Sequence, residues 1–214
     1  MRERVRDRYP VVSTGDASDQ SADLWMDAET VVNALDGACC VLEKPSRSRI
    51  EDVVGAMVLP SNTARVVDRY ALSRNKKLAE PDGLTCLLEF LARRGVVSVE
   101  VASAVSKVSD RRSDLIVESD VQSVVKGICS RIPKAPRVRL KLYSHSEMCE
   151  YAHDRFLSFC NPAAPDTSGS SVQIGPGIRS FTGMLTYPIT ISRVPVETFA
   201  AVWNSLPAVK PIEV

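Results

Sequence analysis

The sequence of 214 residues has no apolar run that approaches the roughly 20 residues needed to cross a membrane. Its first nine residues are rich in arginine and lack the apolar stretch of a signal peptide. The six cysteines include no CxxC pair, the usual spacing of zinc and redox sites. These absences predict a cytoplasmic protein with no transmembrane segment, with reduced and buried thiols, and with no metal or other cofactor.

The sequence also lacks an excess of either charge, since 27 Lys and Arg nearly balance 26 Asp and Glu. A net charge of +1 gives no strong global attraction toward nucleic acid or anionic lipid. The balance is uneven along the chain, because residues 1–62 carry a net charge of −4 and residues 63–214 one of +5. The remaining composition, 44% hydrophobic and 25% charged, is typical of a globular domain with a substantial core.

Residues 1–62 are predicted to form an N-terminal extension, partly disordered, with one helix and one short strand. The helix is expected to begin at Asp27 and end at Gly37, because Asp caps helix N-termini and Gly ends helices. The short buried strand is expected over 38–42, and a polar, basic loop over 44–49.

Residues 63–214 alternate between two hydrophobic patterns and are predicted to form the main domain. Some segments repeat their apolar residues at helical spacing, whereas others alternate apolar and polar residues as strands do. Alternating strands and helices predict an α/β fold with a mixed, mostly parallel sheet and helices on both faces; the closely spaced last strands should be antiparallel. The expected strands are 64–70, 97–101, 138–142, 171–174 and 187–191, and the expected helices are 82–95, 121–132 and a last one from Pro195.

The two histidines of the chain, His145 and His153, restrict any proposal of acid–base or nucleophilic catalysis. His153 precedes a predicted strand and has Asp154 and Arg155 beside it. Residues two apart in an extended segment face the same way, so His153 and Arg155 can converge on one anionic group. Imidazole and guanidinium form a phosphate-binding pair, and the histidine could act as a nucleophile. The alternative is a purely structural tripeptide in which Asp154 and Arg155 form an ion pair.

The basic strand that contains Arg139 and Lys141 is a second candidate for anion binding. Its alternative interpretation is a solvated strand face that discourages pairing at a sheet edge. Gly175 and Gly177 flank a proline and predict a turn rather than a dinucleotide site. Trp203 belongs to the apolar stripe of the final helix and is assigned a structural role.

Several of these pieces follow one another in a recognisable order: Val66–Tyr70, Val97–Val101, Val138–Leu142, Ala152–Leu157, Ile174–Gly177 and the helix with Phe199 and Trp203. Their order and spacing resemble one half-domain of the phospholipase-D-like proteins. More narrowly, they are similar to the domain found C-terminal to microtubule-interacting-and-trafficking modules and to its stand-alone prokaryotic relatives. The resemblance covers about residues 63–206 and implies a phospholipase-D-like half-domain.

The sequence departs from the catalytic pattern of that superfamily, which is His-x-Lys-x4-Asp. His153 matches the histidine, but Arg155 replaces the lysine and Cys160 stands where the aspartate is expected. Arginine keeps the positive charge without being interchangeable with lysine at a phosphate. The superfamily site uses two histidines, so a chain with one motif could assemble it only across a symmetric dimer.

The resemblance therefore implies a catalytically degenerate module that binds an anionic partner, which could be a phospholipid, a nucleic-acid backbone or a protein. Binding is expected through His153, Arg155, Arg139 and Lys141. The module would act as a homodimer or as a subunit of a larger complex, for example in a prokaryotic antiphage defence system. Two alternatives stay open: a metal-independent dimeric phosphodiesterase or nuclease that uses His153, and a structural subunit that docks through residues 1–62.

Overall fold

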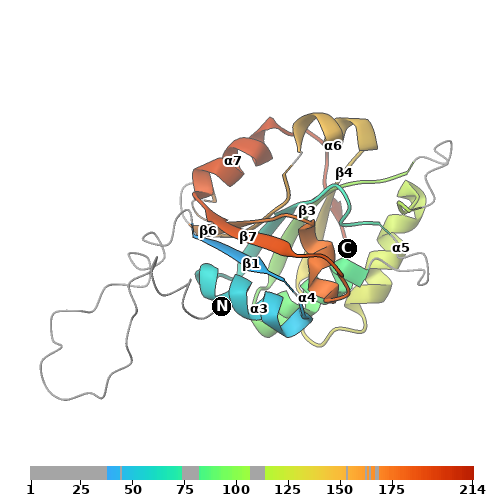
Figure 1. Ribbon diagram of the computed structural model, residues 1–214. Coiled ribbons are helices and arrows are strands. Elements are labelled where there is room, and N and C mark those ends of the chain that lie inside the picture. Colours follow the sequence, from blue (N-terminus) through green and yellow to red (C-terminus); the bar gives the residue numbers. More distant parts are fainter. Residues whose placement is uncertain are drawn as a thin grey trace, which may run out of the picture.

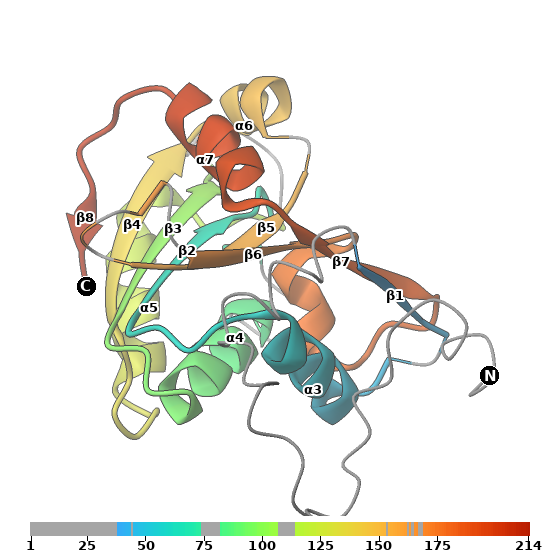
Figure 2. The ribbon, with the colours of Figure 1, turned by 90° about the vertical axis from the view of Figure 1, so that its left-hand side faces the viewer.

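One eight-stranded sheet runs through the molecule in the order β1-β7-β6-β5-β2-β3-β4-β8 (Figures 1 and 2). The computed structural model describes residues 38–43, 45–73, 82–106, 114–152, 154–161, 163, 165–166 and 169–214. The helix expected from Asp27 lies outside these residues. The strands are β1 (Cys39–Leu42), β2 (Thr63–Val67), β3 (Ser98–Ala104), β4 (Arg137–Tyr143), β5 (Phe156–Cys160), β6 (Gly169–Ile174), β7 (Ile189–Val194) and β8 (Ile212–Glu213).

The sheet is mixed, as expected, but the prediction that it is mostly parallel was wrong. Only β2–β3 and β3–β4 are parallel, whereas the other five strand pairs are antiparallel. Parallel neighbours need a crossover of a dozen or more residues, usually through a helix. The first strands of the main domain have such crossovers, but β5, β6 and β7 follow one another without an α-helix between them.

Helices cover both faces of the sheet, which confirms that part of the prediction (Figure 2). One face carries α3 (Arg47–Met57), α4 (Asp82–Arg93), α5 (Glu118–Cys129) and the short 3-10 helix η1 (Gly177–Thr182). The other carries α6 (His145–Tyr151) and α7 (Val196–Ser205). Neighbouring residues of a strand point to opposite faces, so Val66 joins the larger core under α3, α4 and α5, and Val67 the smaller one under α6 and α7. No helix in the described part of the chain is long and apolar enough to cross a membrane.

The strand and helix between residues 38 and 58 share the sheet and core of residues 63–214. β1 pairs with β7, and the buried Leu42, Ile50 and Val54 belong to the larger core. The polar loop expected over 44–49 was wrong, because α3 begins at Arg47. The Ser46 hydroxyl accepts a hydrogen bond from the backbone N–H of Arg49 at 3.3 Å and caps the helix.

A buried arginine of β7 forms a hydrogen bond to the end of α3. Arg193 is only 2% exposed, and its guanidinium donates a hydrogen bond to the carbonyl oxygen of Met57, the last residue of α3, at 2.5 Å. A cation at a helix C-terminus satisfies a carbonyl that has no partner within the helix and interacts favourably with the helix dipole. The position of α3 therefore depends in part on this side chain.

Replacing Arg193 with alanine should lower the free energy of unfolding by about 2 kcal/mol or more, because a charged hydrogen bond and the packing of a long side chain are both lost. Urea denaturation followed by circular dichroism would measure the change. Arg49→Ala, at an exposed position of α3, is the matched control and should stay within about 0.5 kcal/mol of the parent protein. Equal effects of the two substitutions would contradict the role given to Arg193.

The phenol of Tyr143 connects β4 to the chain after α7 and supplies a test at alkaline pH. Its hydroxyl donates a hydrogen bond to the carbonyl of Pro207 at 3.1 Å, and burial, helped by the Glu147 carboxylate, raises its pKa to about 12. Because this pKa is above the ordinary value of about 10, the contribution of Tyr143 to stability is complete below pH 10 and is lost as the pH rises toward 12. The stability advantage of the parent protein over Tyr143→Phe should therefore shrink between pH 10 and 12, and a constant difference would contradict this assignment.

Candidate anion-binding site

Asp68 and Arg155 come together at the edge of the sheet where the parallel strands end. β5 runs antiparallel to β2, and the pairing of Val67 with Phe156 brings the residue after β2 and the residue before β5 to the same edge. Ligands of open α/β sheets commonly bind just beyond the carboxyl ends of parallel strands. The edge that carries Arg155 is therefore a reasonable place for a binding site.

The buried carboxylate of Asp68 joins three segments at this edge. The side chain is 1% exposed, and its two oxygens accept hydrogen bonds from the backbone N–H groups of Tyr70 at 2.8 Å and Ile178 at 2.7 Å. The Nε atom of Arg155 lies 3.9 Å from the same carboxylate. Burial raises the pKa of Asp68, and the two N–H donors and the charges of Arg155 and Arg69 act in the opposite direction.

Gly177 is required for this arrangement. Its φ of +77° lies in the left-handed region, and a Cβ atom there would overlap the Asp68 carboxylate and the Arg155 side chain. Gly175 differs, because it is exposed and a Cβ atom would meet only ordinary contacts. Its contribution is its carbonyl oxygen, which accepts a hydrogen bond from the Arg155 guanidinium.

Two guanidinium groups and an imidazole surround the ring of Tyr70. The Cζ atoms of Arg69 and Arg155 lie 4.7 and 5.5 Å from the ring centroid, and the His145 ring lies 6.1 Å away, centroid to centroid. Arg69 also donates a hydrogen bond to the Cys149 sulfur at 2.8 Å, while its buried Nε atom has no hydrogen-bond partner among the described residues. The ring faces attract these cations, and the result is a concentration of positive charge around one phenol.

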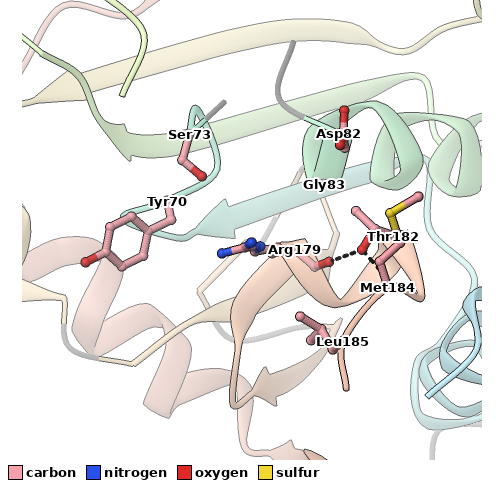
Figure 3. A pocket seen from close by; sticks show the side chains of 8 residues that line it. All are labelled: Tyr70, Ser73, Asp82, Gly83, Arg179, Thr182, Met184 and Leu185. Atoms are coloured by element: carbon pink, nitrogen blue, oxygen red, sulfur yellow. Dashed lines mark hydrogen bonds between the residues drawn. The ribbon is translucent and has the colours of Figure 1, made fainter. Parts of the chain in front are cut away.

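A small cleft of about 60 Å³ opens beside Tyr70, and Figure 3 shows the Arg179 side chain reaching across it toward the Tyr70 ring. Arg179 is exposed, and no described carboxylate pairs with its guanidinium. The volume admits several water molecules or a small anion, at about 10–15 Å³ for a water. The lining residues are Tyr70, Ser73, Asp82, Gly83, Arg179, Thr182, Met184 and Leu185.

Asp82 is the carboxylate among the residues that line this cleft. It lies in the first turn of α4, where the helix dipole favours a negative charge. The lining of the cleft therefore contains one guanidinium and one carboxylate; the Ser73 hydroxyl points toward the guanidinium, whereas the Tyr70 hydroxyl points away from it (Figure 3).

The predicted tripeptide is only partly within the described residues. His153 lies outside them, so its convergence with Arg155 stays a prediction. Asp154 is exposed and accepts a hydrogen bond from the Gln173 amide at 2.9 Å. The ionic partner of Arg155 is Asp68 rather than its neighbour Asp154, because Asp68 lies on the side of the sheet toward which Arg155 points.

The basic strand β4 does not contribute to this site. Arg139 pairs with Glu100 at 2.7 Å and with Glu213 at 3.1 Å, and so connects β4 to both of its neighbouring strands. Arg139 aligns with Glu100 in the register of β3 and β4. Because residues alternate between the two faces of a strand, both side chains point to the face of the sheet covered by α7, away from Arg155.

Lys141 also lies on the α7 face, where its ammonium group stands 4.4 Å from the ring centroid of Trp203. Arg65 approaches the same ring at 5.0 Å. Partial burial lowers the pKa of Lys141. The buried Trp203 packs against Phe199 on this face, whereas Arg155 points to the opposite face. Of the predicted anion-binding residues that the structure describes, Arg155 therefore lies apart from Arg139 and Lys141.

The cysteines differ from expectation. All six are free thiols, but only Cys160 is buried, whereas Cys39 is exposed and the others are half-buried. Cys160 lies in β5 on the α7 face, and burial raises the pKa of its thiol. It therefore places neither a carboxylate nor any polar group beside Arg155.

Several residues of the site were not assigned to it from the sequence: Arg69, Tyr70, Asp68, Ser73, Asp82, His145 and Arg179. The signal for the first two was available, because Asp-Arg-Tyr directly follows β2 at its carboxyl end. Arg179 lies in η1, which follows a segment predicted only as a turn, and its distance from Tyr70 depends on long-range packing.

No protein-family model matches the chain, and no curated protein matches it. Within the described residues, no group of three His, Cys, Asp or Glu side chains is placed to hold a metal ion.

Gly177→Ala should lower the free energy of unfolding by about 2–4 kcal/mol, because the substitution combines a strained φ with overlap onto Asp68 and Arg155. Gly175→Ala, two residues away, is the matched control and should change stability by less than about 1 kcal/mol. Thermal unfolding of both variants measures the difference. If Gly177→Ala is as stable as Gly175→Ala, the close packing of Gly177 on Asp68 is not what holds this edge together.

Proposed function

We propose that this chain binds a phosphate-type anion in the cleft beside Tyr70, as a phospholipase-D-like binding module rather than as an enzyme. The observation that carries the proposal is the exposed guanidinium of Arg179, which has no ion partner in the described part of the chain and reaches across the cleft toward Tyr70. Arg69 and Arg155 lie against the Tyr70 ring.

The chemistry of these groups suits a phosphate. Guanidinium groups bind phosphate oxygens through paired, charge-assisted hydrogen bonds, and the Ser73 hydroxyl group, which points toward Arg179 (Figure 3), can donate a further one. The sequence adds His153 two residues before Arg155. A phospholipid headgroup, a nucleic-acid backbone and a phosphorylated protein all present this anion, and each is a candidate partner for a cytoplasmic homodimer or complex subunit.

The contacts of Arg155 and Cys160 favour binding over catalysis. Arg155, in the position of the catalytic lysine, is held by Asp68 and the Gly175 carbonyl. Cys160, in the position of the aspartate, is buried on the other face of the sheet. The mixed sheet with helices on both faces is compatible with a phospholipase-D-like half-domain, and the assignment to that family is part of the proposal.

Arg179→Ala should weaken the binding of inorganic phosphate and of bis(p-nitrophenyl) phosphate at least about tenfold, because a charged hydrogen bond contributes about 1.5–3 kcal/mol. Isothermal titration calorimetry at low ionic strength measures both affinities. Arg49→Ala removes another exposed arginine, from α3, and should leave both affinities unchanged. Added salt should weaken binding to the parent protein.

Two results would count against this function. Equal affinities of the parent protein and Arg179→Ala would remove the cleft as the binding site. Hydrolysis of bis(p-nitrophenyl) phosphate that disappears in His153→Ala, with the fold intact, would instead favour the dimeric phosphodiesterase.

A further inference from the structure

A second concentration of positive charge lies at the opposite edge of the sheet from the cleft. Residues 121–146 contain six Lys and Arg and no Asp or Glu. Arg139 and Lys141 of this stretch are occupied on the sheet face by ion pairs and by the Trp203 ring. The other four are exposed at the end of α5, in the turn that follows it and at the first residue of β4: Lys126, Arg131, Lys134 and Arg137.

Three of these cations, Lys126, Lys134 and Arg137, have no ion pair with another described residue. Val97, which is 62% exposed, lies beside Arg137, since its carbonyl oxygen accepts a hydrogen bond from the backbone N–H of Arg137 at 2.9 Å. We call Lys126, Lys134, Arg137 and Val97 the basic surface.

The helix dipole accounts for only part of this surface. Lys126 lies in the last turn of α5, where a cation stabilises the helix. The dipole effect falls off within that turn. Lys134, which has a left-handed φ of +57°, and Arg137 lie beyond the helix end, so the helix dipole does not account for these two cations.

The sequence contains a segment of complementary charge. Residues 16–36, outside the described residues, have six Asp and Glu and no Lys or Arg. They also contain the apolar residues Leu24, Trp25 and Met26. A surface that combines cations with an exposed valine matches such a segment in both charge and hydrophobicity.

The acidic segment can reach the basic surface in the same molecule. β1 and β4 run in the same direction, and the register of the strands between them places Ala38, which precedes β1, level with Leu140, three residues along β4 from Arg137. Six strand spacings of about 4.8 Å separate the two strands, or about 29 Å. An extended chain from residue 16 to residue 37 spans up to about 70 Å.

We propose that the basic surface binds the acidic segment 16–36 of the same chain. Within one molecule the segment is present at high effective concentration, so several weak ion pairs suffice to hold it. A protein segment fits better than a single-stranded nucleic acid, which uses aromatic side chains for base stacking. The exposed aromatic residues among those described, Tyr151 and Tyr187, lie on α6 and before β7, away from this surface.

Zero-length carbodiimide cross-linking of the full chain, followed by peptide mass spectrometry, tests this proposal. Lys126 and Lys134 should join to carboxylates of residues 16–36 within the monomer. The yield should fall several-fold as salt is raised from about 10 mM to about 1 M, because the Debye length falls from about 30 Å to about 3 Å. Lys210, an exposed lysine on the segment before β8, is the control and should join to them much less.

Charge reversal makes the test independent of lysine reactivity. Lys134→Glu with Arg137→Glu should reduce cross-linking through Lys126 several-fold, with the same circular dichroism as the parent protein. Adding Asp23→Lys and Asp27→Lys should restore cross-links between the two regions.

Four results would overturn the proposal. The first two are cross-linking yields at Lys210 equal to those at Lys126 and Lys134, and yields that do not change with salt. The third is cross-links found only in dimers, which would assign the surface to a second copy. The fourth is a charge-reversed variant that loses binding to DNA but keeps its cross-links, which would assign the surface to nucleic acid. Phosphate binding at Arg179 is measured separately, and its success or failure does not affect this result.

Discussion

The buried carboxylate of Asp68 is the interaction on which the carboxyl edge of the sheet depends. Removing a carboxylate from water is costly unless hydrogen bonds and opposite charges replace the lost hydration. Here two backbone N–H groups and the nearby Arg155 do so, and they come from three separate segments. Because each segment is held by the same group, the turn after β2, the start of η1 and the approach to β5 are fixed relative to one another. Tyr70 and Arg179 of the cleft belong to two of these segments.

The antiparallel strand β5 is what makes this interaction possible. If β5 ran parallel to β2, the residue before it would emerge at the amino edge, on the far side of the sheet from Asp68. The reversal of direction brings Arg155 to the end of β2 instead. The site therefore requires a mixed sheet. The expectation of a mostly parallel sheet was wrong because of antiparallel strands such as β5, and β5 is the strand that places Arg155.

Local patterns predicted the elements well where one periodicity was clear. The helix from Asp82 and the strand over 138–142 are present because each has a single apolar face of the expected period. Of the described residues of the site, the sequence predicted Arg155, and the place of His153 stays a prediction. Its other residues depend on strand register, on Gly177 fitting against Asp68 and on η1 packing, none of which leaves a periodic pattern in the sequence.

Strand β4 illustrates why charge in a sequence does not translate directly into a binding face. Its three cations alternate with apolar residues and looked like one basic stripe. Arg137 is exposed at the strand start, Arg139 is held by two carboxylates and Lys141 lies on the Trp203 ring. All three point to the same side, but β8 and α7 cover only the last two. The coverage of a strand by elements distant in sequence, rather than its composition, therefore decides which of its charges can meet a partner.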